Sequence, residues 1–130
     1  MKNEATLGQR RESETGTTDQ VEIPPTQIYP AHGTQKARVL AAMLAGRQIN
    51  PLSAWREFGV YRLADVIHQL KRKNGWPVVP ADLPVRNTFG EECIVGLYSL
   101  DQKAIDAAGD EGQRYVIDER EVLREMRRAA

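Results

Sequence analysis

The sequence has a single cysteine and no long apolar run, and each scarcity excludes a class of protein. With one cysteine among 130 residues, the chain cannot form an internal disulfide. Cys93 falls in a predicted strand, where a buried, unreactive thiol is expected. No apolar run approaches the length that spans a bilayer, and no charged-then-apolar start resembles a signal peptide. We therefore expect a cytoplasmic protein without membrane contact.

The residue patterns that support catalysis or metal binding are also missing. The sequence contains no glycine-rich phosphate loop, no cluster of metal ligands and no nucleophile paired with a base. Its two histidines, His32 and His68, are well separated along the chain, which disfavours a metal site. We therefore expect neither an enzyme nor a bound metal or cofactor.

The net charge is zero, but its distribution divides the chain into three regions. Residues 1–33 carry three basic and five acidic residues, a net charge of −2. Residues 34–100, the predicted folded domain, carry nine basic and five acidic residues, a net charge of +4. Residues 101–130, a C-terminal extension, carry six basic and eight acidic residues, again −2. The positive middle region has the sign expected for a nucleic-acid partner.

The first region is rich in Thr, Glu, Gln and Pro, which predicts a disordered N-terminal tail over residues 1–33. Within it, residues 23–30 form a more apolar, proline-containing patch. A plain linker is the commonest outcome for such a patch, and packing on the domain or docking to a partner are the alternatives.

A pair of short helices joined by a glycine turn is the central feature of the domain. Asn50 can cap the first helix, Pro51 can take its first position, and Gly59 can adopt the positive φ that ends it. The second helix is expected over residues 61–74, and another helix upstream over residues 34–46. The apolar face of the second helix consists of Leu63, Val66, Ile67 and Leu70. Its opposite face is basic, and this pattern is typical of a DNA-binding helix-turn-helix.

Beyond this helix the periodicity changes to that of strands. A strand is expected over residues 76–80, a loop over 81–90 and a returning strand over 91–100. Residues 48–49 could add a short strand ahead of the helix pair. The expected fold class is thus α+β, a winged helix-turn-helix with three helices and a small antiparallel wing. Four aromatic residues on predicted buried faces are expected in the core: Trp55, Phe58, Trp76 and Tyr98.

The C-terminal extension is expected to be partly helical. One turn is predicted within residues 103–108, and a longer helix over 115–130 with Asp118 as its cap. A narrow apolar stripe on that helix consists of Val122, Leu123 and Met126. Since this stripe is too small for a separate core, it either packs on the domain or pairs two copies of the chain.

Between residues 34 and 100 the sequence resembles a family of helix-turn-helix domains common in bacteriophages and prophages, including regulators of Mu-like phages. The resemblance rests on the stretches LAAMLAGRQINPLSA (40–54) and FGVYRLADVIHQLKRKNGWPV (58–78). The matching positions are Ile49, Pro51, Ala54, Phe58, Gly59, Arg62, Leu63, Ile67, Leu70, Lys71, Gly75, Tyr98 and Leu100. The resemblance implies the winged fold, double-stranded DNA as partner and action in the cytoplasm of a bacterial host.

In such domains the second helix lies in the major groove with its first residues nearest the bases. The exposed candidates for base readout are Tyr61, Arg62, Asp65, His68 and Gln69. Arg62 could instead fasten the turn through backbone carbonyls or Glu57, and Asp65 could orient Arg62 or Gln69. The candidates for phosphate contact are Lys36, Arg38, Arg47, Arg56, Lys71, Arg72, Lys73 and, near the wing loop, Arg86. Residues 71–73 could equally be a solvated helix end.

These patterns favour a sequence-specific transcription regulator of phage or prophage type that binds double-stranded DNA. It would form a dimer or higher oligomer through its C-terminal helix and could contact RNA polymerase or another phage protein. One alternative is an architectural factor for excision, transposition or replication. Another is an adaptor that uses the winged fold to bind protein rather than DNA, since a fold does not by itself fix a function.

Overall fold

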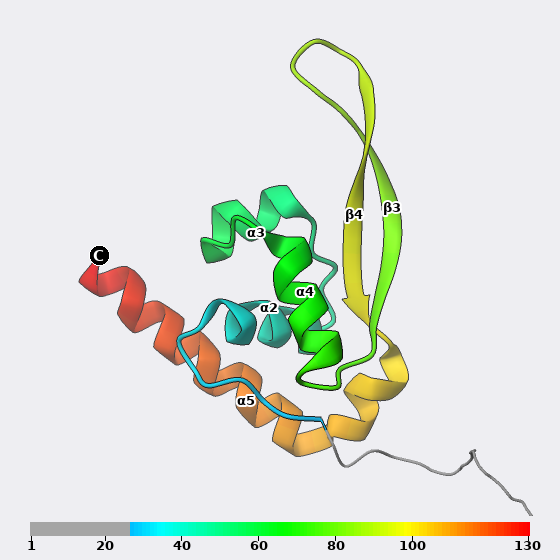
Figure 1. Ribbon diagram of the computed structural model, residues 1–130. Coiled ribbons are helices and arrows are strands. Elements are labelled where there is room, and N and C mark those ends of the chain that lie inside the picture. Colours follow the sequence, from blue (N-terminus) through cyan, green and yellow to red (C-terminus); the bar gives the residue numbers. More distant parts are fainter. Residues whose placement is uncertain (1–26) are drawn as a thin grey trace, which may run out of the picture.

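The computed structural model describes residues 27–130, and predictions for residues 1–26 lie outside this range. Its elements are α2 (Gln35–Leu44), α3 (Pro51–Phe58), α4 (Leu63–Arg72), β3 (Val78–Arg86), β4 (Glu92–Leu100) and α5 (Gln102–Ala129). Figure 1 shows the β3–β4 hairpin standing beside α3 and α4 and extending beyond them. The predicted α+β fold, with a helix-turn-helix followed by a wing, is confirmed.

The helix ends follow from local chemistry. The Thr34 hydroxyl accepts from the Ala37 amide at 3.2 Å and begins α2. The Asn50 side chain accepts from two amides of α3, and the Ser53 hydroxyl accepts from the Asn50 amide. Together these hydrogen bonds form a capping box. Gly59 ends α3 in the left-handed region, with φ 67°. These caps confirm the predicted bounds of both helices to within two residues.

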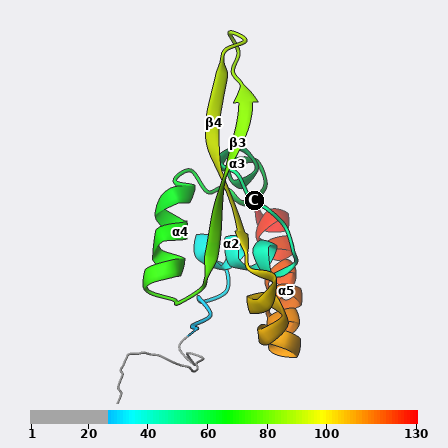
Figure 2. The ribbon, with the colours of Figure 1, turned by 90° about the vertical axis from the view of Figure 1, so that its right-hand side faces the viewer.

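Helix α2 lies at the centre of the fold. Figure 2 shows α4 on one side of α2 and α5 on the other, and both helices contact it. Seven of its ten residues are therefore buried: Ala37, Val39, Leu40, Ala41, Ala42, Met43 and Leu44. The predicted apolar face of α4 packs into the same core. None of the helices in residues 27–130 combines the length and the apolar character needed to cross a membrane.

The hairpin corrects the predicted loop over residues 81–90. Strand β3 continues to Arg86, in antiparallel register with β4 from Val78 opposite Leu100 to Arg86 opposite Glu92. Pro80 and Pro84 do not interrupt it because neither position pairs its amide with β4. The only turn is at residues 87–91, where the Asn87 side chain accepts from two amides. The wing is therefore a long ribbon with a short tip.

The register also shows where the strand amides point. Tyr98 exchanges two hydrogen bonds with Ile49, both of 2.8 Å, so its backbone faces away from β3. In an antiparallel pair such positions alternate along the strand. Pro80, opposite Tyr98, is thus at a position that needs no amide. The bridge between Ile49 and Tyr98 also confirms the short strand predicted ahead of α3.

The C-terminal helix begins earlier than predicted, and Asp118 does not cap it. Asp101 caps α5 by accepting from the Lys103 amide at 3.3 Å, and Gly109 introduces a kink with φ 54°. Tyr115 and Val116 are buried in the core that α2 forms. Because these contacts carry the helix past Asp118, that carboxylate lies exposed within it.

The apolar stripe of α5 faces the domain in part. Val122 and Leu123 are half-buried, and Leu123 packs against the core. Met126 is 43% exposed. Packing on the domain, one of the two predicted outcomes, thus accounts for the start of the stripe, while pairing of two copies remains a prediction.

Residues 28–33 form a strap rather than part of a disordered tail. The Ile28 amide donates to the Asn74 carbonyl at 2.9 Å, and the Tyr115 hydroxyl donates to the Pro30 carbonyl at 2.6 Å. The Tyr29 ring lies between Trp76 and Tyr115, with centroid distances of 5.1 and 4.8 Å. The packing alternative for the proline-containing patch is therefore the correct one over these residues.

Two further predictions about burial are wrong. Trp55 is 56% exposed and its neighbour Leu52 is 57% exposed, because a groove separates this face of α3 from the hairpin. Cys93 is only half-buried. It lies on the face of the two-stranded ribbon that borders this groove, and no other part of residues 27–130 covers that face fully. The other predicted core aromatics, Phe58 and Trp76, are buried, and Tyr98 packs against the core.

Candidate nucleic-acid interface

The turn between α3 and α4 fixes the orientation of the second helix. The left-handed Gly59 redirects the chain, and Val60 is then fully buried and donates its amide to the Ala54 carbonyl at 3.1 Å. This anchor places residues 61 and 62 on the surface at the start of α4. The helix thus presents its first turn and one full side to solvent, away from α5 (Figure 2).

The predicted base-reading residues gather on this exposed side. A shallow depression at the start of α4 is lined by Gln35, Tyr61, Arg62, Asp65, Val66 and Gln69. His68 is exposed on the same helix. Gln35, contributed by the first turn of α2, was not among the sequence candidates. In the sequence, the one feature that marks Gln35 is its position next to a helix cap. Its proximity to α4 is set by the tertiary fold and is not visible in the sequence.

Arg62 and Asp65 form an ion pair within the first turn of α4. The distance from Arg62 Nε to Asp65 Oδ2 is 2.8 Å, and the two side chains are 74% and 60% exposed. Such an exposed pair adds little stability, and in it the guanidinium points toward the Asp65 carboxylate. Of the alternatives weighed for these residues, orientation of Arg62 by Asp65 is the one observed. Glu57 is engaged elsewhere.

Tyr61 is the most exposed residue of this region, and an aromatic contact holds it. Its side chain is 80% exposed, and its ring meets that of Trp55 edge-on with centroids 5.8 Å apart. The exposed Trp55 therefore supports the residue that precedes the helix, a role that sequence reasoning missed by assigning it to the core.

Among the exposed candidates for DNA contact, the basic residues are concentrated at the C-terminal end of α4. Lys71, Arg72 and Lys73 are all exposed there. Lys36, from α2, lies at the same end because its Nζ donates to the Asn74 side chain at 3.3 Å. Asn74 was also missed. It is buried, and its amide group donates to the Ile28 carbonyl at 3.0 Å, so it fixes the strap against the end of α4.

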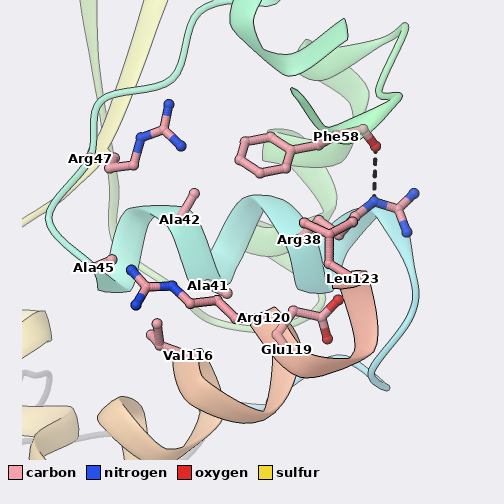
Figure 3. A pocket seen from close by; sticks show the side chains of 10 residues that line it. All are labelled: Arg38, Ala41, Ala42, Ala45, Arg47, Phe58, Val116, Glu119, Arg120 and Leu123. Atoms are coloured by element: carbon pink, nitrogen blue, oxygen red, sulfur yellow. Dashed lines mark hydrogen bonds between the residues drawn. The ribbon is translucent and has the colours of Figure 1, made fainter. Parts of the chain in front are cut away.

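Two of the predicted phosphate contacts have hydrogen-bond partners within the fold. Arg38 Nε donates to the Phe58 carbonyl at 2.9 Å, the contact drawn in Figure 3, and its Nη1 donates to the Gly33 carbonyl at 3.2 Å. Arg38 lies on the rim of a small crevice of about 70 Å³ between α2 and α5. It is therefore turned toward α5 and away from the exposed side of α4.

Arg47 forms a two-pronged ion pair with Glu57. The Nη1–Oε1 and Nη2–Oε2 distances are 2.7 and 2.8 Å, and the guanidinium lies 5.6 Å from the centroid of the Phe58 ring. Figure 3 shows this guanidinium directed toward that ring. The hydrogen bonds lower the pKa of Glu57 and raise the pKa of Arg47. Arg47 thus fastens the loop after α2 to α3.

The wing is acidic rather than basic. Between residues 78 and 100 it carries three carboxylates (Asp82, Glu91 and Glu92) and one guanidinium (Arg86), a net charge of −2. Arg86 donates to the Gly90 carbonyl at 2.6 Å and so braces the tip. The remaining candidate, Arg56, is exposed on α3. Among the candidates for DNA contact, the exposed positive charge thus lies mainly on α4.

Residues 34–103 match a family described as a winged helix-turn-helix domain, a span of more than half of the chain. The chain belongs to this family. The winged helix-turn-helix assignment agrees with the observed order of α2, the bridge at Ile49, α3, α4 and the hairpin. It places the chain among helix-turn-helix domains of the DNA-binding type. No curated protein and no solved structure matches the chain.

Within residues 27–130, no three side chains of His, Cys, Asp or Glu gather in a way that could hold a metal ion. Arg62 at the start of α4 and Gln69 on its exposed side can donate to base edges, and the lysines at its end can meet phosphates.

Proposed function

We propose that the chain is a sequence-specific, double-stranded-DNA-binding transcription regulator of phage or prophage type, acting in the bacterial cytoplasm. The observation that carries this proposal is the exposed side of α4, where Arg62, paired with Asp65, precedes a helix that carries Gln69 on the same side and ends in three cations. The resemblance to regulators of Mu-like phages supports the biological setting.

In the proposed complex α4 lies in the major groove with its first turn against the bases. Arg62 donates two hydrogen bonds to a guanine edge, and Gln69 pairs with an adenine. Asp65 keeps the Arg62 guanidinium in position, and Tyr61 and His68 contact neighbouring bases or sugars. The phosphate contacts come from Lys36, Lys71, Arg72 and Lys73, with Arg56 extending the footprint. Arg38 and Arg47 are left out because their guanidinium groups bind acceptors of α3, the Phe58 carbonyl and Glu57, and Arg86 is left out because it stands among the carboxylates of the acidic hairpin.

The proposal is tested by binding of the full chain to a duplex taken from the DNA that flanks its own gene. A scrambled duplex is the control, and NMR titration at low and moderate salt is the measurement. Chemical-shift changes should concentrate in residues 61–73, weaken with salt and be stronger for the flanking duplex. Equal shifts with both duplexes would instead identify an architectural binder. No shifts in α4 at low salt would exclude DNA readout by this helix and leave the adaptor.

Matched variants separate base readout from phosphate contact. Gln69→Ala should reduce the preference for the flanking duplex by about 1–3 kcal/mol. Lys73→Gln should weaken binding to both duplexes alike and lower the salt dependence of binding. Lys103→Gln removes an exposed lysine on α5 and should change neither quantity. Loss of affinity without loss of preference in Gln69→Ala would contradict its reading role.

A further inference from the structure

An apolar groove lies between α3 and the distal half of the hairpin. Its volume is about 630 Å³, within the range of ligand-binding clefts. The lining is Asn50, Pro51, Leu52, Trp55, Tyr61, Leu83, Val85, Arg86 and Val95. Arg86 is the only charged residue in this set. The proposed DNA contacts of α4 leave most of this surface unused.

The two edges of the hairpin differ beside this groove. On β3 the backbone positions that point away from β4 include Pro80 and Pro84, which lack amide donors and so block the addition of another strand. On β4 the positions that point away from β3 continue from Tyr98 to Gly96, Ile94 and Glu92. Within residues 27–130, backbone pairing on this edge of β4 stops at the bridge between Ile49 and Tyr98.

An extended segment could continue the line of Ile49 along β4. It would exchange backbone hydrogen bonds with the outward-facing Glu92, Ile94 and Gly96. Cross-strand neighbours share one face of a sheet, so the segment residues opposite Cys93 and Val95 would direct their side chains to the groove side. Ile94, which is 60% exposed, would be covered on the other face.

We propose that the β4 edge and the adjoining groove bind an extended segment of a partner protein by strand addition. The segment carries apolar side chains at two alternate positions, for the groove, and a carboxylate that meets Arg86. DNA does not suit this surface, because the groove is apolar and Arg86 is the one cation among its lining residues. The proposal does not depend on DNA binding by α4, although Tyr61 lines both surfaces.

The experiment is selection of a displayed library of random ten-residue peptides on the full chain, followed by fluorescence anisotropy with one enriched peptide. Ile94→Pro removes one outward amide from the open edge, and Asp82→Pro is the matched control at an outward position on the blocked edge. Neither position pairs its amide across the hairpin. Arg86→Gln and Trp55→Ala test the groove separately, and thermal unfolding checks that each variant folds.

The expected result is enrichment of alternating apolar residues with an acidic neighbour. The peptide should bind Ile94→Pro about tenfold more weakly and Arg86→Gln several-fold more weakly, with affinity for Asp82→Pro unchanged. In the complex the amides of Glu92, Ile94 and Gly96 should become protected from hydrogen exchange. No enrichment, or peptides that bind Ile94→Pro as well as the parent, would overturn the proposal. Self-association lost in Ile94→Pro but kept in Asp82→Pro would show that a second copy occupies the edge, which also overturns it.

Discussion

The His32 imidazole and the Glu119 carboxylate meet across 87 positions of the sequence, with Nδ1 and Oε1 2.6 Å apart. The Glu119 side chain is 2% exposed, and its two oxygens also face the Gly33 amide at 3.3 and 3.4 Å. The His32 ring stacks on Tyr115 with centroids 4.5 Å apart. One buried carboxylate thus ties the strap, the start of α2 and α5 together.

Glu119→Ala should destabilise the fold by about 1–3 kcal/mol, because it leaves the half-buried Gly33 amide without its acceptor. Urea unfolding measures the difference. Glu121→Ala is the control, since Glu121 is exposed and pairs only with Arg124 on the surface of α5. It should change stability by less than about 0.5 kcal/mol. Equal effects of the two substitutions would show that Glu119 is not a structural clasp.

Tyr115 should make the fold sensitive to alkali. Burial, the nearby Glu119 and Tyr29 raise the pKa of Tyr115 above its ordinary value of 10.0. Because the unfolded chain ionises first, the stability that neutral Tyr115 provides is complete below pH 10 and is lost as pH rises above it. Tyr115→Phe should be less stable than the parent at pH 7 and lose less stability between pH 9 and 11. Tyr61→Phe, at an exposed position, should follow the parent at every pH.

The Arg47–Glu57 pair should contribute to stability only above acidic pH. Arg47 lowers the pKa of Glu57 below its ordinary value of 4.5, so the unfolded chain takes up the proton first as pH falls. The contribution is complete above about pH 4.5 and is lost as pH falls through the lowered pKa of the folded state. Since both side chains are about 40% exposed, a double-mutant cycle with Arg47→Gln and Glu57→Gln should give about 0.2–1 kcal/mol at pH 7. A coupling energy that stays constant from pH 7 to pH 3 would contradict this account.

The two tryptophans should respond very differently to truncation. Trp76 is 1% exposed, and its indole donates to the Ile28 carbonyl at 2.9 Å, so Trp76→Ala should cost about 3–5 kcal/mol. Trp55→Ala should cost less than about 1 kcal/mol, because more than half of that side chain already meets solvent. Chemical denaturation followed by far-UV circular dichroism compares them. A large loss in Trp55→Ala would mean that the groove is closed in solution.

Pairing of two copies through α5 predicts a change in sedimentation. Met126 is exposed near the end of the stripe, so Met126→Glu should shift the chain toward the monomer without unfolding it. Ile117→Glu alters an equally apolar, exposed residue of α5 outside the stripe and should leave the association state unchanged. If both variants sediment as the parent does, α5 does not pair two copies.

Much of the fold was predictable because its signals are local. Asn50, Pro51 and Gly59 define α3 and its turn within ten residues of sequence, and the spacing of apolar residues defines the buried face of α4. The failures involve competing local signals. Asp101 and Asp118 are both acceptable caps, and contact of Tyr115 with the core decided between them. Pro84 indicates a loop until a partner strand shows that its amide is not needed.

The sequence by itself determined the positions of the helices, the basic character of α4 and the charge of each region, because these follow from neighbouring residues and from composition. Only the tertiary structure decided which cations are available to a ligand. Arg38 and Arg47 are indistinguishable in sequence from Lys71 and Arg72, but their hydrogen-bond acceptors, the Phe58 carbonyl and Glu57, come from another helix. The same holds for the open edge of β4 and its groove, which exist because α3 and the hairpin are held apart by the core beneath them.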